Sequence, residues 1–327
     1  MNEQKSFWEE KIKIKNFNIP RFMSAPMDGI TDSPMRQLIR TFSPEILLFT
    51  EMRHVATIAN DKKEKSLEYS KIEHPICFQI SAGSTIFLHQ AIEKIIDKKF
   101  DMINLNAGCP ARRVVGSGSG SKLMENISQL QKIIHQCIKI IDNRTPFSLK
   151  IRAGYKEKNA YDIALMAQDL GVDFLIIHPR TQQENFIGTL DFKLVEKIKT
   201  KVYIPLIFSG NITSFESTKK TYELTGVDGF MIGRALLGAP WKIHEIMQKS
   251  IGNKFNISNK QSVKSALEHL NLNSKFYGSQ VGFKLLKSHI AGYIKNIPNA
   301  AKIRNAIVTC TTEQDMQKKL TELIKIL

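Results

Sequence analysis

The stretch FSLKIRAGYKEKNAYDIALMAQDLGVDFLIIHPR, from Phe147 to Arg180, contains the pattern that decides the fold. It begins and ends with short, nearly continuous apolar runs, which are typical of parallel strands covered on both faces. Between these runs, apolar residues from Ile163 to Leu170 recur at helical spacing, and Gly171 ends that pattern. The stretch is therefore predicted to form a strand–helix–strand unit.

The same pattern continues on both sides of this stretch. Eight apolar runs of this kind begin at Phe22, Glu45, Pro75, Asp101, Phe147, Phe174, Tyr203 and Gly229. Helical patterns lie between them, for example the apolar repeat from Ile127 to Ile141. Eight strands alternating with helices over about 225 residues predict an α/β fold, the (β/α)8 TIM barrel. A doubly wound open sheet is the competing architecture, but no G-x-G-x-x-G motif follows the first strand.

The composition changes after the last of these runs. Residues 1–248 are predicted to form the barrel, and the polar segment IGNKFNISNKQS lies within a predicted linker of residues 249–262. Residues 263–327 contain only helical patterns, such as VKSALEHLNLNSKFYG, and they carry several lysines. We therefore expect a small, basic, all-helical domain after the barrel.

The bulk composition indicates a globular protein with an anionic partner. The 327 residues are 42% hydrophobic and 24% charged, and the formal net charge is +16. Such an excess of basic residues usually means a nucleic acid or a membrane surface as partner, although compositional drift alone would also produce it. No apolar run approaches the roughly 18 residues of a membrane span, and the N-terminus has no apolar signal region.

The four cysteines are scattered along the chain and form no C-x-x-C pair; they are Cys77, Cys109, Cys137 and Cys310. This spacing argues against a zinc site and a disulfide framework, and it suits a reducing cytosol. No cluster of carboxylates or histidines suggests another metal. We expect a cytoplasmic monomer with no membrane segment and no bound metal.

One loop is longer than the others, and it contains Cys109. The fourth and fifth strands start 46 residues apart, at Asp101 and Phe147, and the surplus holds the segment NAGCPARRVVGSGSGSKL. The segment is predicted to be a flexible, basic insertion at the C-terminal face, where barrel active sites lie. Gly108 and Pro110 force a turn that leaves the thiol near the barrel mouth, although Cys109 could also be a buried or space-filling residue. A thiol is mostly protonated at neutral pH and can act as an acid.

Polar residues at the other strand ends are further candidates, because these ends point into a barrel's active site. They include Gln79, Asn106, Lys150, Arg152, His178, Arg180, Ser209, Gly210, Asn211, Gly233 and Arg234. Gly210 and Gly233 would let backbone N–H groups approach a phosphate closely. Lys150 interrupts an apolar strand and needs a partner there, either a salt bridge or the electron-rich edge of a cofactor such as a flavin. A nucleophilic pair of Cys109 with His178 also stays possible.

These motifs, taken in order, resemble those of the tRNA-dihydrouridine synthase family, most closely its bacterial B-type members. SAPMDGITDSPMRQL, from Ser24, is similar to the family's A-P-M-A-G-x-T-D-x-P-F-R. NLNAGCPARRVV and GSGSKLM are similar to D-x-N-x-G-C-P-x-x-K-V and G-A-G-S-A-L-L. LKIRAG, IHPRT, SGNI, MIGRALLGAPW and the helical-domain motif FYGSQVGFKLLKSH match in order and spacing, so the resemblance covers nearly the whole chain.

The resemblance implies a reaction, its cofactors and its substrate. It implies tightly bound FMN, NADPH as reductant, and reduction of the uracil C5=C6 bond in tRNA, usually in the D-loop. Cys109 would be the catalytic proton donor to C5, while the FMN N5 atom gives hydride to C6. Asn106 and Arg180 would read the uracil, and the loop residues Arg112 and Arg113 would touch RNA phosphates. The cofactor-binding residues would be Pro26, Met27, Asp28, Gln79, Lys150, His178, Ser209, Gly210, Asn211, Gly233 and Arg234.

The chain departs from the family pattern at a few positions. Asp28 replaces the usual alanine, and the other departures are Gly116, Lys122, Pro179, Ser209 and Asn211. A carboxylate beside reduced flavin would disfavour its anion, so we expect Asp28 to face away or to pair with Lys150.

Two other functions share parts of this pattern. A barrel flavin reductase for a small molecule, such as a dihydroorotate dehydrogenase, would need neither the basic helical domain nor the loop arginines. A non-catalytic RNA-binding protein or chaperone with the same fold would contain no flavin.

Overall fold

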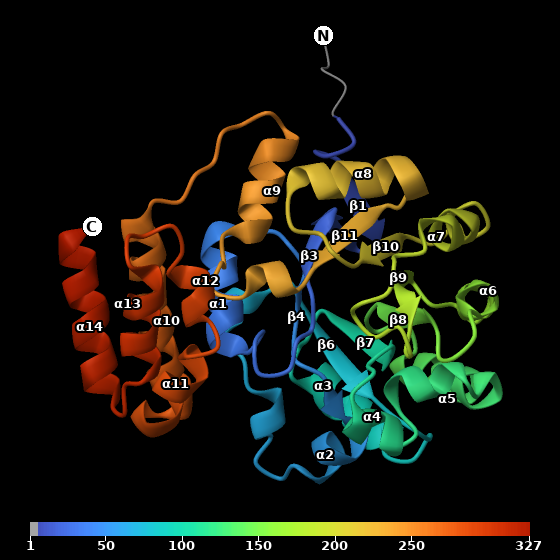
Figure 1. Cartoon of the computed structure of the whole chain (residues 1–327). Helices are drawn as coiled ribbons and strands as arrows, with labels where there is room; N and C mark the ends of the chain where they lie inside the picture. Colours follow the sequence, from blue (N-terminus) through green and yellow to red (C-terminus); the bar gives the residue numbers. More distant parts are fainter. Residues whose placement is uncertain (1–5) are drawn as a thin grey trace.

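Eight parallel strands form the barrel in the computed structural model, which describes residues 6–327 (Figure 1). They are β3 (Phe22–Ser24), β4 (Leu48–Phe49), β6 (Ile76–Ser81), β7 (Met102–Ala107), β8 (Phe147–Gly154), β9 (Phe174–Thr181), β10 (Leu206–Ser209) and β11 (Gly229–Ile232). Every strand overlaps one of the eight predicted runs. The strand order is β3-β11-β10-β9-β8-β7-β6-β4, and the parallel bridge between Met23 and Leu47 joins its two ends. The predicted barrel is therefore confirmed.

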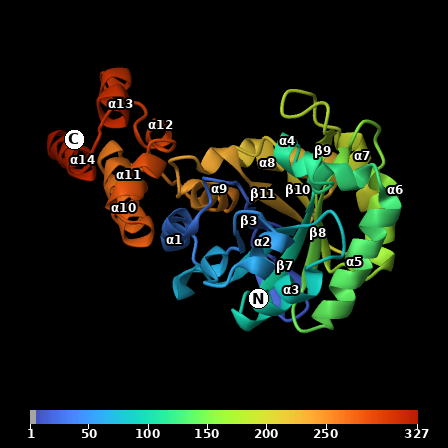
Figure 2. The same cartoon turned by 90° about the horizontal axis from the view of Figure 1, so that it is seen from below.

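Helices surround the strands because the outward-facing residues of the strands are mostly apolar (Figure 2). They are α1 (Ser33–Phe42), α2 (Val55–Asn60), α3 (Leu88–Asp97), α5 (Ile127–Ile141), α6 (Ala160–Asp169), α7 (Phe192–Lys199), α8 (Phe215–Thr225) and α9 (Lys242–Ser250). Several begin at a side chain that caps free backbone N–H groups: Asp32 caps α1, Asn126 caps α5 and Asp191 caps α7. The apolar repeat from Ile127 to Ile141 is α5, as predicted.

A β-hairpin that the sequence analysis did not predict closes the bottom of the barrel. Its strands are β1 (Lys11–Ile14) and β2 (Phe17–Pro20). Ile12, Ile14 and Ile19 pack into the same apolar cluster as inward-facing barrel residues such as Phe174. The hairpin therefore fills the barrel interior from below, at the end opposite the carboxyl ends of the strands.

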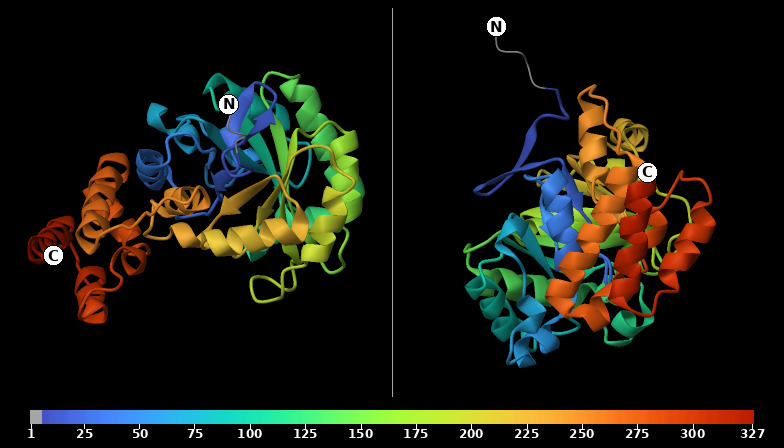
Figure 3. Two further views of the ribbon diagram at one scale, coloured as in Figure 1. Left: turned by 90° about the horizontal axis from the view of Figure 1, so that it is seen from above. Right: turned by 90° about the vertical axis from the view of Figure 1, so that its left-hand side faces the viewer.

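The C-terminal region forms a separate helical cluster beside the barrel (Figure 3). Its helices are α10 (Asn259–Tyr277), α11 (Ser279–Leu286), α12 (Ile290–Tyr293), α13 (Ala300–Val308) and α14 (Glu313–Ile326). Ser258 and Gln261 form a capping box at the start of α10, so the segment predicted as linker contributes the first turn of this helix. Trp241, from the end of the barrel, packs into the helical core.

Among the described residues, no helix is long and apolar enough to cross a membrane. None of the described cysteines forms a disulfide: Cys77, Cys137 and Cys310 are buried, and Cys109 is partly exposed.

Candidate active site

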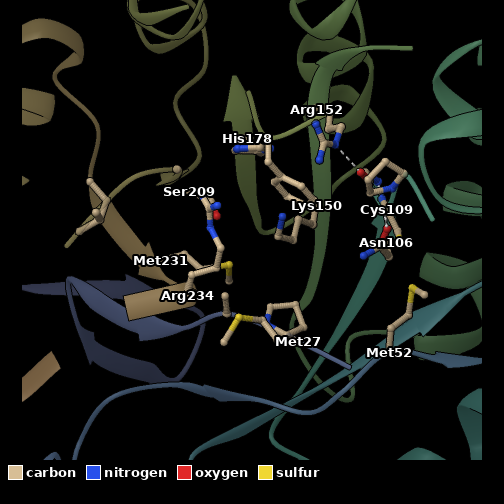
Figure 4. A pocket seen from close by; sticks show the side chains of 18 of the residues that line it. Met27, Met52, Asn106, Cys109, Lys150, Arg152, His178, Ser209, Met231 and Arg234 are labelled. Carbon is tan, nitrogen blue, oxygen red and sulfur yellow. Dashed lines mark hydrogen bonds between the residues drawn. The ribbon is translucent and has the colours of Figure 1, made fainter. Parts of the chain in front are cut away.

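A cavity of about 500 Å³ opens at the carboxyl ends of the barrel strands (Figure 4). This volume is typical of a pocket for a drug-sized ligand or cofactor. Cys109, Asn106 and all eleven residues predicted to bind the cofactor line it: Pro26, Met27, Asp28, Gln79, Lys150, His178, Ser209, Gly210, Asn211, Gly233 and Arg234. The structure thus brings together residues that are spread over more than two hundred positions of the chain.

Lys150 lies in the wall of the cavity between Cys109 and His178 (Figure 4). It projects from β8, whose inward positions alternate with apolar residues that face the helices. Within residues 6–327, no hydrogen bond or ion pair involves its ammonium group. Desolvation by the surrounding protein, together with the nearby Arg152, lowers the pKa of Lys150 to about 8. An ammonium held in this way is ready to bind an electron-rich group that enters the cavity.

His178, on β9, is a neutral imidazole. Burial and four nearby cations lower its pKa to about 2; the cations are Lys150, Arg152, Arg180 and Arg234. Arg180 Nη1 lies 3.3 Å from His178 Nε2. Because a guanidinium can only donate, Nε2 is the acceptor and Nδ1 carries the proton.

Two glycines, Gly210 and Gly233, line the end of the cavity after β10 and β11. Gly210 has φ +152°, and a Cβ there would press against Leu190 and His178 at 2.9 and 3.1 Å. At Gly233, by contrast, a Cβ would make only ordinary van der Waals contact with Ala25 and Met27. Arg234 Nη2 donates to Asn211 Oδ1 at 3.2 Å, which holds a guanidinium over this end. Exposed N–H groups beside a guanidinium suit a phosphate.

The backbone of Cys109 is held by a chain of amides that runs into the barrel. Asn106 Oδ1 accepts from the N–H groups of Gly108 and Cys109 at 3.0 and 2.8 Å. Asn106 Nδ2 donates to Gln79 Oε1 at 3.0 Å, and Gln79 Nε2 donates to Asn104 Oδ1 at 2.8 Å. The Asn106 oxygen is therefore used to position Cys109, and its amide group has one N–H left for a ligand.

The Cys109 loop is folded more regularly than its glycines suggested. It contains α4 (Arg112–Gly116) and a 3-10 helix, η3 (Gly120–Met124). The Cys109 carbonyl accepts from the N–H and the hydroxyl of Ser121 at 3.0 and 2.9 Å. Gly83 and Gly120 allow close packing at this loop, because a Cβ at either position would collide with neighbouring backbone.

Arg152 joins the Cys109 loop to the loop after β9. It is 2% exposed, and its Nε donates to the Gly108 carbonyl at 2.7 Å (Figure 4). Its Nη1 donates to the carbonyls of Thr181 and Asn185 at 3.0 and 2.7 Å. The sequence showed Arg152 at a strand end, but only the fold reveals that it holds two loops.

Three predicted substrate residues do not line the cavity. Arg112 and Arg113 are exposed on α4, next to the mouth. Arg180 is 4% exposed and donates to the Gly188 carbonyl as well as to His178. Its guanidinium therefore lies behind the imidazole, where it orients His178.

Asp28 does not pair with Lys150. Its carboxylate is 83% exposed and lies 3.3 Å from Arg53 Nη1, while Arg53 Nη2 also pairs with Glu51 at 2.8 Å. Of the two expectations for Asp28, pairing with Lys150 is therefore wrong, and the carboxylate instead lies against Arg53 on a neighbouring loop.

Several lining residues were not predicted. Met52, Phe186 and Met231 contribute apolar surface to the cavity. Met231 could have been found from the alternation of β11, because it lies two residues before Gly233. Met52 and Phe186 belong to loops, where no periodicity reveals which side chains face inward.

The residues that line the cavity fit a flavin. It combines an unpartnered ammonium with a backbone cradle for a phosphate and an apolar surface of methionines. Over the described part of the chain, no group of three His, Cys, Asp or Glu side chains is placed to hold a metal ion.

The architecture is shared with barrel flavoenzymes of known structure. Morphinone reductase superimposes with a TM-score of 0.55 at 13% identity, covering 76% of this chain and 90% of that one. An old yellow enzyme homologue from Zymomonas mobilis superimposes with a TM-score of 0.57 at 13% identity, covering 75% and 93%. At this identity the likeness defines the fold class only, a TIM barrel with its cavity at the C-terminal face.

Comparison of sequences then identifies the family. The family model "Dihydrouridine synthase (Dus)" matches residues 23–327. The tRNA-dihydrouridine synthase B of Pseudomonas aeruginosa is 30% identical over 299 residues, covering 90% of each chain. That of Xanthomonas campestris is 31% identical over 314 residues, covering 92% of each. The chain belongs to the dihydrouridine synthase family, and it is a flavin-dependent oxidoreductase that reduces uridine.

Proposed function

We propose that this protein reduces the C5=C6 bond of uridine in tRNA, with FMN as the resident cofactor and NADPH as its reductant. The observation that carries the proposal is the position of Cys109 and Lys150 in the walls of one cavity at the barrel mouth. The relatives named above carry the same substrate class in their names. We further propose a cytoplasmic monomer that acts on the D-loop.

The residues present suit FMN at each end of the cavity. Lys150 and Gln79 would bind the polar edge of the ring system, and Pro26 and Met27 would contact its plane. The N–H groups near Gly210 and Gly233, with Arg234, would bind the phosphate. His178 is neutral because of burial and the nearby cations, and Arg180 orients its ring. It would lie between the ring system and the phosphate of the cofactor. When bound, the flavin supplies the hydride that adds to C6 of the uracil.

Cys109 supplies the other half of the reduction. Hydride addition at C6 leaves negative charge on C5 and O4, and the thiol gives its proton to C5. Asn106 accepts a hydrogen bond from the Cys109 N–H, and Arg152 donates one to the Gly108 carbonyl. The backbone that carries the thiol is therefore fixed in the cavity wall. The free N–H of Asn106 is available to the uracil.

The substrate reaches the cavity only as an unstacked base. Uracil within a stacked strand cannot approach a ring at the bottom of a barrel mouth, so the base must swing out. Arg112 and Arg113, exposed beside the mouth, would bind the flanking phosphates, and the lysines of α10 to α14 would extend this contact.

Replacement of Cys109 by alanine tests the proposal. We expect Cys109→Ala to retain its flavin spectrum and its affinity for tRNA, and to lose about 10²- to 10⁴-fold in dihydrouridine formation. The rate of dihydrouridine formation is measured by single-turnover oxidation of the reduced enzyme with unmodified tRNA. Mass spectrometry of nucleosides measures the yield of dihydrouridine. A normal yield from this variant would remove the acid role. A colourless wild-type protein that binds tRNA without turnover would instead support a non-catalytic RNA-binding protein.

A further inference from the structure

The loop after β9 is built around two buried guanidinium groups. Arg152 Nη1 donates to the Asn185 carbonyl at 2.7 Å, and Arg180 Nε donates to the Gly188 carbonyl. The two arginines are 2% and 4% exposed. The two accepting carbonyls lie immediately on either side of the dipeptide Phe186–Ile187, which we call the tip.

The local backbone fixes the shape of this loop. Asn185 adopts a left-handed conformation, with φ +53°. The N–H groups of Ile187 and Gly188 both donate to the Glu184 carbonyl, and a Cβ at Gly188 would press on the Glu184 side chain at 2.7 Å. Burying a guanidinium is costly unless its hydrogen bonds are satisfied. Here each of the two guanidinium groups donates one hydrogen bond to a carbonyl that flanks the tip. These two hydrogen bonds therefore hold the dipeptide in place.

The tip presents the half-exposed Phe186 to the cavity and Ile187 to solvent. Phe186 lines the cavity, and its ring lies 5.1 Å from the Arg152 guanidinium and 5.5 Å from that of Arg234. Ile187 is 94% exposed, the highest value among the large apolar side chains of residues 6–327. Figure 3 shows the yellow-green loop standing out from the barrel in its left panel.

We propose that Ile187 is a wedge that enters the base stack of the RNA where the target uridine has left it. This inference rests on the proposed function. A flipped base leaves a gap, and apolar side chains fill such gaps between bases in other nucleic-acid complexes. Phe186 lies beside the cavity that receives the uracil, so the next residue along the chain is placed at the neighbouring base. The cations around the mouth make RNA the partner that charge favours over an apolar protein surface.

A fluorescent substitution tests where the tip lies in the complex. We expect the indole of Ile187→Trp to be quenched when unmodified tRNA is added to the holoenzyme, because it would stack on bases. Ile72→Trp is the matched control, since Ile72 is 52% exposed and precedes β6 at the opposite end of the barrel. The native Trp8 and Trp241 also fluoresce, and a titration of the wild-type protein measures their contribution. Equal responses of the two variants would overturn the wedge.

Kinetics provide the second arm. Ile187→Ala should keep its flavin content and lose on the order of 10-fold in kcat/KM for folded tRNA, while Ile72→Ala should be unchanged. A tRNA with an abasic site next to the target uridine has no stack to fill, so the difference between wild type and Ile187→Ala should largely disappear. An unchanged kcat/KM for Ile187→Ala would contradict the inference. Absence of dihydrouridine with the wild-type enzyme would instead refute the proposed function, and the quenching result would still decide where Ile187 lies.

Discussion

At the scale of single residues, the most informative feature is a charge without a counter-charge. Lys150 lies near Arg152, and burial together with this guanidinium lowers the pKa of Lys150 to about 8, so the protein alone stabilises its charged form poorly. Such a group contributes little to the stability of the protein alone, because burial opposes its charge. Its position is explained if the binding of an electron-rich ring restores the favourable interaction.

This residue predicts a pH dependence for flavin binding. Below pH 8 Lys150 is protonated before the ligand arrives, and above pH 8 a proton must be taken up with the ligand. FMN affinity of the apoprotein should therefore fall as pH rises above 8, by up to about 10-fold per pH unit until the pKa of the complex is reached. Fluorescence titration of FMN from pH 6.5 to 9.5 measures this. Lys150→Arg, which stays charged, should abolish the dependence, and an identical profile for both proteins would contradict the prediction.

At the scale of elements, β8 organises the site. Its inward residues Ser148, Lys150 and Arg152 have successive tasks from the middle of the barrel to its mouth. Ser148 Oγ accepts from Asn104 Nδ2 at 2.8 Å, Lys150 faces the cavity, and Arg152 holds the loops after β7 and β9. The period of two residues along one strand thus separates structural support, ligand binding and loop positioning.

The loop after β7 depends on close packing against the loop after β6. A Cβ at Gly83 would collide with the Ser117 carbonyl, whereas a Cβ at Gly116 on α4 would meet only open space. We expect Gly83→Ala to displace the Cys109 loop and to lower dihydrouridine formation by about 10² while flavin stays bound. Gly116→Ala should behave like wild type. Steady-state kinetics and flavin absorbance check both variants, and full activity of Gly83→Ala would show that the loop tolerates the shift.

At the scale of the whole molecule, the barrel and the helical region meet through backbone. Gly238 N donates to His289 Nδ1 at 3.2 Å, and a Cβ at Gly292 would collide with the Leu237 carbonyl. Asp32, at the start of α1, also interacts with Tyr277 on α10, and burial raises the pKa of Asp32 to about 6. These contacts fix the orientation of the lysine-containing helical region relative to the barrel.

A larger side chain at this contact should weaken tRNA binding without affecting flavin binding. Gly292→Ala is expected to keep its flavin, because the apolar cluster around the barrel strands is separate from the one that contains the helical region, and to bind tRNA about 10²-fold more weakly. Ala291→Ser, at the exposed neighbouring position, is the control. Filter binding and flavin content measure the two effects. Normal tRNA affinity in Gly292→Ala would mean that RNA binding does not need this contact.

The sequence by itself determined the eight strands, their alternation with helices and most of the strand-end residues that line the cavity, but not Met52, Phe186 or Met231. Apolar periodicity and the position of a residue at a strand end are local properties, so they can be read from the sequence. The β1–β2 hairpin was missed although Lys11 to Ile14 alternates strictly, because four residues at a chain end give a weak signal. Ordered motifs provided the family resemblance, which reaches from the first barrel strand to the helical region.

Only the tertiary structure decided how those residues are used. Asp28 pairs with Arg53, Arg180 lies behind His178, and Ile187 stands at a loop tip held by arginines from two neighbouring strands. Each of these facts depends on which side chains meet across loops of different lengths. No periodic pattern in the sequence predicts these side-chain contacts. The conformation of a loop depends on the packing of the whole barrel rather than on the spacing of the loop's own residues.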